Sequence, residues 1–370
     1  MTARMLSLAC RIAGGRGGVA LRTAVLFTLV ASLVAIPRFS ASAHTTHTTY
    51  PKPPWIIGLS NSLYGNGWRE EMVCSVKAEA AATPYARLVS KVLVTQAGQD
   101  PARQISDIRG LISQGANAIL INPPNPTALN GVIEQAVRRG IVVVVMDQLV
   151  TSRAPYQVEN NQVEYGTVGM AWLARQLHGK GNAVIVRGIA GAPADTDREN
   201  GIRIALKKYP GIHVIGEIYS EWNPVTALQR ISTFLPAHPK IDGWWTSGVG
   251  GQVVQAYQQA KRKFVPVVGA DGNDFLAYLY DLRRQGLIGA AVTNPPAVGS
   301  AAFDIALKVL QGQTVPKITK LMPRVWDNTE VANLKGKFFR KLGPSFQAAW
   351  NVPGYSHYAF SQMTGCFGKA

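Results

Sequence analysis

Hydrogen-bonding and aromatic side chains follow several apolar segments of this 370-residue chain, close to the point where each segment ends. Asp147 and Gln148 follow the apolar residues 141–146, and Asp271 follows residues 265–270. Comparable positions hold Ser62, Asn66, Trp68, Arg69, Arg198, Trp222 and Asn294. Carboxylates accept hydrogen bonds, amides and guanidinium groups donate them, and an indole face packs on the C–H side of a sugar ring. Such a set suits a small polyol, because each buried charged hydrogen bond contributes about 1.5–3 kcal/mol.

The sequence contains no arrangement that is typical of an enzyme. Residues 188–191 (GIAG) do not fit the dinucleotide-binding pattern G-x-G-x-x-G, and no G-x-S-x-G nucleophile elbow is present. Asp195 and Asp197 are expected on one loop, where they could form a carboxylate pair, but nothing supplies the remainder of a hydrolase site. We therefore predict no catalytic residue, no metal site and no cofactor.

The polar residues after the apolar segments also have a structural interpretation, which the sequence leaves open. Asp147 and Asp271 could cap the helices that follow them. Arg198 could be a solvated charge on a helix, and Trp222 could belong to the core. The binding interpretation is favoured because the two aspartates follow buried strands in different halves of the chain, where ligands of open α/β sheets bind.

Short apolar segments alternate with segments of helical periodicity from Trp55 onward. Residues 141–146 (IVVVVM) are continuously apolar, which is typical of a strand buried on both faces of a parallel sheet. About nine such units are too many for one compact doubly wound sheet, so we predict an α/β fold with two parallel-sheet lobes. The expected strands are residues 55–61, 88–95, 118–122, 141–147, 183–187, 213–218, 243–247, 265–270 and 289–293.

Residues 1–43 have the features of a secretory signal peptide. Four arginines and no acidic residue precede the apolar residues 23–37. This run is shorter than the roughly 20 residues of a membrane-spanning helix, and Ala41-Ser42-Ala43 fits the A-x-A cleavage pattern. We therefore predict that residues 1–43 direct export and that residues 44–54 form a linker. An uncleaved membrane anchor is the alternative.

The formal net charge of +17 falls to +12 without residues 1–43, which contain five arginines and no acidic residue. The remaining basic residues are scattered, so we predict no nucleic-acid partner and attribute the charge to solubility. Export also bears on the cysteines, since Cys74 and Cys366 would then lie in an oxidising compartment. A disulfide between them, from the first helix to the C-terminal tail, is our hypothesis.

Five segments, taken in order, resemble the periplasmic sugar-binding proteins of ABC transporters, specifically the type I, ribose-binding-like group. They are residues 99–104, 115–123, 140–147, 188–191 with Arg198 and Gly201, and 268–272. The resemblance covers residues 56–315 and implies two lobes that are joined by three crossovers and close on a monosaccharide. Residues 55–151 and 295–320 would form the N-terminal lobe, residues 152–294 the C-terminal lobe, and residues 321–370 an extended tail.

The resemblance also implies a ligand site, carried over position by position. Ser62, Asn66, Trp68 and Arg69 would line the N-terminal lobe, with Trp68 stacked on the sugar. Asp147, Arg198, Trp222, Asp271 and Asn294 match further ligand-binding positions. The sequence departs from the family at Arg69, where ribose binders have an aromatic residue, at Gln148, which replaces an arginine, and at Gly248, which replaces an asparagine. These departures indicate a ligand other than plain ribose.

The combined expectation is an exported, monomeric solute-binding protein, periplasmic or extracellular, that captures a sugar or polyol and delivers it to an ABC permease in the membrane. A binding module that feeds a membrane sensor or chemoreceptor would have the same fold. An exported glycoside hydrolase is a further alternative, which would require a catalytic pair in the cleft. The effector domain of a lactose-repressor-type regulator is disfavoured, because residues 1–54 contain an export signal and no helix-turn-helix.

Overall fold

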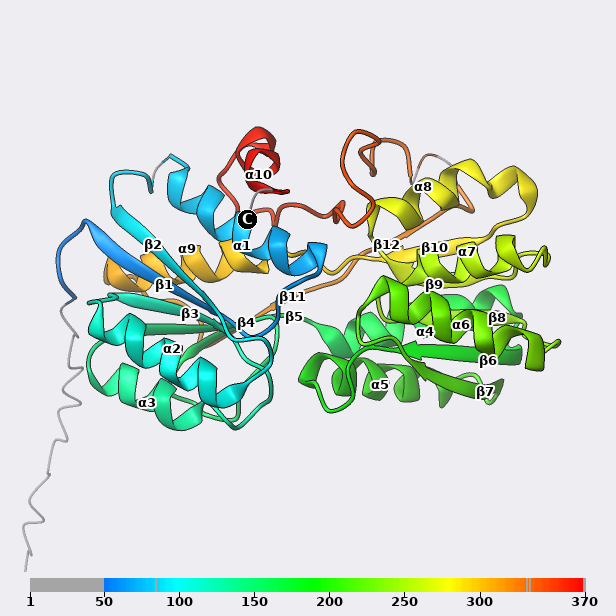
Figure 1. Ribbon diagram of the computed structural model, residues 1–370, viewed down its shortest axis with the longest axis horizontal. Helices are drawn as coiled ribbons and strands as arrows, with labels where there is room; N and C mark the ends of the chain where they lie inside the picture. The colour runs from blue at the N-terminus through cyan, green and yellow to red at the C-terminus, as the bar shows by residue number, and fades with distance from the viewer. Residues whose placement is uncertain (1–49, 84, 331, 333, 369–370) are drawn as a thin grey trace, which may run out of the picture. The chain divides into compact units, whose positions relative to one another are not determined.

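The computed structural model of the protein describes residues 50–83, 85–330, 332 and 334–368. The predicted signal peptide and residues 44–49 of the predicted linker lie outside the described residues. The described chain forms two six-stranded sheets, each with helices on both faces (Figure 1). This arrangement confirms the predicted α/β fold of two lobes with largely parallel sheets.

The sheet of the N-terminal lobe has the strand order β11-β5-β4-β3-β1-β2, and all its neighbouring strands are parallel. Its strands are β1 (Trp55–Asn61), β2 (Val89–Gln96), β3 (Ala118–Asn122), β4 (Val142–Met146), β5 (Tyr156–Asn160) and β11 (Ile318–Leu321). Its helices are α1 (Gly67–Ala81), α2 (Pro101–Ser113), α3 (Asn130–Arg138) and α9 (Val298–Leu310). Val144 of β4 packs with α1 and α9, whereas its neighbour Val145 packs with α2 and α3. The continuous apolar run of β4 is therefore explained by burial on both faces.

The sheet of the C-terminal lobe has the order β12-β10-β9-β8-β6-β7, and β12 alone among these strands is antiparallel to its neighbour. Its strands are β6 (Lys180–Arg187), β7 (Gly211–Tyr219), β8 (Gly243–Thr246), β9 (Val267–Ala270), β10 (Gly289–Val292) and β12 (Val325–Asp327). Its helices are α4 (Gln162–Gln176), α5 (Pro193–Leu206), α6 (Pro224–Ala237), α7 (Gly250–Gln259), α8 (Asn273–Asp281) and the 3-10 turn η1 (Arg283–Gln285). The adjacent Trp244 and Trp245 of β8 are both buried, and they point into the two opposite helix layers.

The chain passes between the two sheets three times, from β5 to α4, from β10 to α9 and from β11 to β12. One predicted lobe boundary is wrong, because β5 pairs with β4 and so belongs to the N-terminal lobe, not to residues 152–294. The sequence of β5, YQVEN, is short and mostly polar, and lacks the apolar run that marked the other strands. The C-terminal tail adds β12 to the second sheet and ends in α10 (Phe360–Cys366), which packs against α1.

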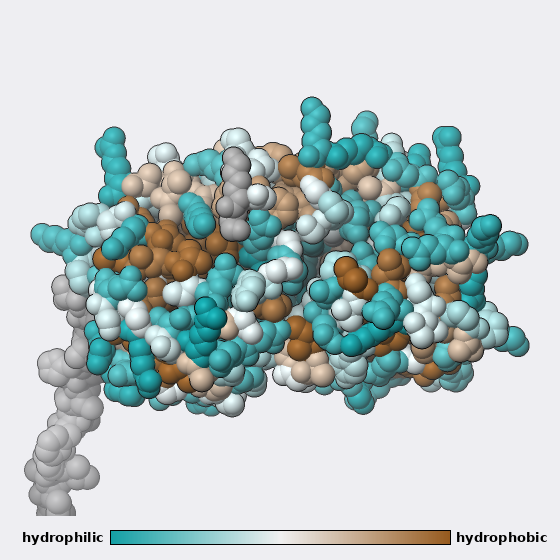
Figure 2. Space-filling model, viewed as in Figure 1, coloured by the Kyte–Doolittle hydropathy of each residue, from teal (hydrophilic) through white to brown (hydrophobic). Residues whose placement is uncertain are grey.

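Hydrophilic residues cover most of one face of both lobes, with smaller hydrophobic areas between them (Figure 2). Among the described residues, no helix is long and apolar enough to cross a membrane. The described part of the chain also lacks a cluster of three or more His, Cys, Asp or Glu residues that could hold a metal ion.

Candidate functional site

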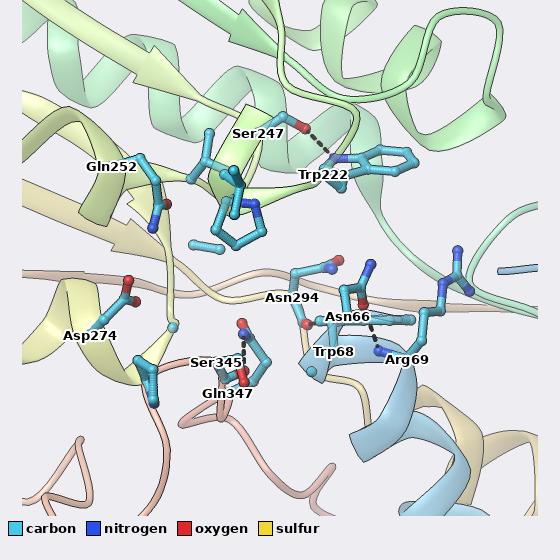
Figure 3. A pocket seen from close by; sticks show the side chains of 18 of the residues that line it. Asn66, Trp68, Arg69, Trp222, Ser247, Gln252, Asp274, Asn294, Ser345 and Gln347 are labelled. Atoms are coloured by element: carbon cyan, nitrogen blue, oxygen red, sulfur yellow. Dashed lines mark hydrogen bonds between the residues drawn. The ribbon is translucent and has the colours of Figure 1, made fainter. Parts of the chain in front are cut away.

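A cavity of about 350 Å³ lies at the carboxyl ends of strands from both lobes, the usual ligand position in open α/β sheets (Figure 3). Eight of the eleven predicted binding residues line it, namely Asn66, Trp68, Arg69, Asp147, Arg198, Trp222, Gly248 and Asn294. The rest of the wall comes mainly from the first turns of α6, α7 and α8, and from residues 344, 345 and 347 of the tail. Both lobes and the tail therefore enclose one space.

The first turn of α1 brings three wall residues to the cavity. The side chain of Asn66 accepts a hydrogen bond from the backbone N–H of Arg69 at 2.9 Å, and this contact caps the helix. Trp68 Nε1 donates to the carbonyl oxygen of Asn294 at 2.6 Å, so the indole is tied to the crossover before α9. The guanidinium of Arg69 lies over the Trp68 ring, 5.0 Å from its centroid.

Two buried guanidinium groups line the cavity near a single carboxylate. Nη2 of Arg69 is 3.8 Å from Oδ2 of Asp147, and each of these side chains is only 6% exposed. Arg198 donates from Nε to Gln162 Oε1 and from Nη1 to Ser247 Oγ, each at 2.8 Å. Burial lowers the pKa of Arg69, although the carboxylate of Asp147 opposes this shift. The guanidinium groups of Arg69 and Arg198 thus present fixed hydrogen-bond donors, which suit hydroxyl or anionic oxygens of a ligand.

Trp222 contributes a second indole, from the turn after β7. Its backbone has a φ of +49° and follows Glu221 with a φ of +57°, which are left-handed conformations for residues other than glycine. Such conformations cost on the order of 1–3 kcal/mol each and are concentrated at functional sites. The ring packs on Gly188, where an added Cβ would approach it to 2.2 Å, and Nε1 donates to Ser247 Oγ at 3.0 Å. The turn thus holds the ring in one position.

The predicted cavity contacts are wrong for Ser62 and Asp271, because both side chains are engaged elsewhere. Ser62 Oγ donates to Asn122 Oδ1 at 3.0 Å inside the N-terminal lobe. The carboxylate of Asp271 is fully buried and accepts from the backbone N–H groups of Asn294 at 2.9 Å and Ala349 at 2.7 Å. Because the tail takes up one of its oxygens, Asp271 supports the wall instead of facing the cavity.

Gln148 is the third residue that the structure places outside the wall. Its Nε2 donates to the carbonyl oxygen of Pro123 at 2.9 Å, within the N-terminal lobe. Its Oε1 accepts from the backbone N–H of Ala194 at 3.3 Å, in the first turn of α5 in the C-terminal lobe. Gln148 therefore connects the two lobes beside the cavity.

Sequence reasoning missed six polar residues of the wall, namely Ser247, Gln252, Gln255, Asp274, Ser345 and Gln347. Gln252 and Asp274 lie in the first turns of α7 and α8, so the search after strand ends could have found them had it extended by a few residues. Ser345 and Gln347 carry no such signal, because the tail reaches the cavity from outside the alternating pattern. Burial raises the pKa of Asp274 to about 6, opposed by hydrogen bonds from Phe275 and Gln252.

Cys74 on α1 and Cys366 on α10 form a disulfide, with a Cα–Cα distance of 5.6 Å. Around it, Ala78 and Ala82 of α1 pack with Met363 in a small apolar cluster. The end of the tail is therefore fixed, covalently and by packing, to the same helix whose first turn lines the cavity.

Comparisons with known proteins agree with this architecture. A sequence profile described as a periplasmic binding protein domain matches residues 57–314. The xylitol-binding protein of Mycolicibacterium smegmatis is 30% identical over 67% of this chain and 72% of its own length. The ribose import binding protein of Bacillus subtilis is 27% identical over 80% of this chain and 93% of its own length.

Among solved structures, an ABC transporter solute binding protein from Thermobispora bispora has a TM-score of 0.71 at 28% identity, covering 79% of this chain and 89% of that chain. These relatives are named as binding proteins, not as enzymes. With its two parallel-sheet lobes, three crossovers and interlobe cavity, the chain belongs to the periplasmic binding protein family, as a type I member.

Proposed function

We propose that this protein captures a sugar or polyol outside the cytoplasm and delivers it to an ABC importer. The observation that carries the proposal is the enclosure of one cavity by Trp68 from the N-terminal lobe and Trp222 from the C-terminal lobe, beside Arg69, Asp147 and Arg198. Indole faces suit the C–H side of a sugar ring, while the charged groups suit its hydroxyls. The relatives named as xylitol-binding and ribose import binding proteins support the same ligand class.

The mechanism we propose is closure of the two lobes on the ligand. The three crossovers act as the hinge, and a ligand that contacts both walls stabilises the closed state over the open one. Asp147 and Arg69 would hold hydroxyls from one lobe while Arg198 holds them from the other. Affinity then equals the gain from these bridging contacts less the free energy needed to close.

Delivery to a membrane permease is the part of the proposal that rests on relatives alone. A sensor would use the same cavity and differ only in its membrane partner. Import is favoured because two relatives carry the names ribose import binding protein and ABC transporter solute binding protein. Export to the periplasm or cell exterior follows from the same relationship and from the predicted signal peptide, and we propose that the exported protein acts as a monomer without catalytic activity.

A thermal-shift screen of residues 44–370 tests the proposal, with pentoses, hexoses, polyols, sugar acids and amino acids as probes. A sugar or polyol should raise the melting temperature by mass action. Arg198→Ala should remove this shift, because about 2–4 kcal/mol of binding is lost when hydroxyls stay unpaired in a closed cleft. Arg203→Ala is the matched control, since Arg203 lies on the same helix with an exposed side chain paired to Glu199. A blank sugar and polyol panel would contradict the proposal.

A further inference from the structure

The C-terminal segment, residues 334–368, is anchored on the C-terminal lobe where it reaches the cavity. The backbone N–H groups of Asn273 and Asp274 donate to the carbonyl oxygens of Phe346 at 2.7 Å and Pro344 at 3.1 Å. The side chain of Asn273 adds three bonds to carbonyl oxygens of residues 339, 342 and 343. The start of α8 therefore holds this part of the segment through both backbone and side-chain hydrogen bonds.

The same segment is also anchored on the N-terminal lobe. The backbone N–H of Gln347 donates to Oε2 of Glu71 on α1 at 2.7 Å. Gly67, the first residue of α1, approaches so closely that an added Cβ would lie 2.4 Å from Ser345 Oγ. The Cys74–Cys366 disulfide fixes the end of the segment to α1. Residues 344–347 are thus held between both lobes as a preorganised piece of the cavity wall.

The cavity has two polar ends. Arg69 lies at one end, close to Trp68 and Asn66, and Asp274 lies at the other, with Ser345 and Gln347 between Asp274 and Trp68 (Figure 3). Apolar side chains of Val225 and Leu228 from α6 also line the cavity. A monosaccharide held between the indoles and the arginines would leave the Asp274 end without a ligand group.

The end near Asp274 has the chemistry of a hydroxyl site. Oδ1 of Asp274 accepts the backbone N–H of Phe275 at 2.7 Å, and the carboxylate also accepts a hydrogen bond from the side chain of Gln252. Two carboxylate oxygens have about four lone-pair positions, so these contacts do not use all of them. The carboxylate can therefore accept a further hydrogen bond from a ligand. Gln252 is buried, with 8% of its surface exposed, and its side chain donates to Asp274, while Gln347 Nε2 donates to the carbonyl oxygen of Ser345 at 3.0 Å. Each amide has a second N–H and a carbonyl oxygen with which to bind a hydroxyl group.

We propose that Gln252, Asp274 and Gln347 form a second subsite, which binds a hydroxyl-bearing group joined to the sugar or polyol that lies near Arg69. The ligand class is then a disaccharide or a glycosylated polyol. This inference rests on the proposed function and narrows its ligand class. It makes Gln347, a residue of the C-terminal segment, a specificity-determining residue.

Isothermal titration calorimetry on residues 44–370 tests the subsite with matched probes. The monomeric probes are D-xylose, xylitol, D-glucose and D-galactose, and the paired probes are xylobiose, cellobiose, maltose and melibiose. At least one disaccharide should bind roughly tenfold more tightly than its monosaccharide, as one or two added hydrogen bonds allow. Gln347→Ala should reduce that advantage to about twofold or less, by weakening disaccharide binding more than monosaccharide binding, because the backbone bond to Glu71 is retained and only the subsite side chain is lost.

Gln313→Ala is the control, since Gln313 lies exposed after α9 and its side chain donates to Gln311 Oε1 at 3.0 Å. Asp274→Asn supplies a second variant at the subsite that keeps the side-chain volume, and it should also weaken the disaccharide selectively. Monosaccharides that bind as tightly as their disaccharides, in wild type and Gln347→Ala alike, would overturn the subsite and leave the proposed function standing. An absence of binding by either class would contradict both.

Discussion

The backbone N–H of Ala194 donates to the side-chain oxygen of Gln148 at 3.3 Å, across the boundary between the two lobes. Gln148 is itself held in the N-terminal lobe through the carbonyl oxygen of Pro123. A contact that exists only when the lobes are close stabilises the closed state relative to the open one, and a ligand that binds the closed state gains the same amount. Gln148 is therefore positioned to tune affinity without touching the ligand.

We expect Gln148→Ala to weaken ligand binding about fivefold, because one hydrogen bond of roughly 1 kcal/mol is lost from the closed state only. Calorimetry with the best sugar or polyol of the thermal-shift screen measures the affinity, and small-angle X-ray scattering measures whether the ligand-free protein becomes more open. Gln114→Ala is the control, since its side chain lies exposed at the end of α2. Unchanged affinity in Gln148→Ala would show that this contact does not stabilise closure.

We expect Asp271 to contribute mainly to the free energy of unfolding, because its carboxylate supports the cavity wall and does not face the ligand. Its carboxylate accepts backbone N–H groups from the crossover at Asn294 and from the tail at Ala349, and it is fully buried. Asp271→Ala leaves both donors without their partner, so we expect a loss of about 2–4 kcal/mol in the free energy of unfolding. Urea denaturation measures this loss, with Asp107→Ala on α2 as the control. A variant with wild-type stability would contradict the supporting role.

The limits of sequence reasoning follow from where the strands lie. Strands such as β4 are covered by helices on both faces, and their continuous apolar runs predicted them correctly. β11 is an edge strand with half of its residues exposed, and β12 has only three residues, so neither has an apolar run. β5 is largely buried although it is mostly polar, because its polar side chains find hydrogen-bond partners in the fold: Gln157 Oε1 accepts from the backbone N–H of Val150 at 2.9 Å, and Asn160 Nδ2 donates to the carbonyl oxygen of Pro295 at 3.1 Å.

In the site, too, residues that follow a strand could be predicted, whereas contacts with partners far along the chain could not. The rule that ligands lie after parallel strands placed Asp147, Trp222 and Asn294 at the cavity. The rule could not show that Asp271 is occupied by the backbone of Ala349, since that partner lies 78 residues further along the chain. For the same reason the contribution of Gln347 to the cavity became visible only in the folded structure.

The disulfide between Cys74 and Cys366 spans 292 residues, so it restricts nearly the whole described chain when unfolded. A cross-link of this kind typically contributes 2–4 kcal/mol, mainly by reducing the entropy of the unfolded state. We expect Cys366→Ser to lower the melting temperature, and a reductant to lower that of the wild type to the same value. The reductant should leave the variant unchanged, which separates the disulfide from other effects. A wild-type melting temperature that is insensitive to reductant would contradict the prediction.

Asp274 should make the stability of the ligand-free protein depend on pH in an unusual direction. Burial raises its pKa from 3.8 to about 6, so the native state holds the proton more tightly than the unfolded chain does. The carboxyl group is thus favourable to stability below about pH 4, and this advantage is lost as the pH rises through about 6. Asp274→Asn cannot ionise, and its melting temperature should exceed that of the wild type at pH 7.5, with the difference shrinking toward pH 4.5. Asp107→Asn serves as control, and a difference for Asp274→Asn that does not change with pH would show that the buried carboxylate is not the cause.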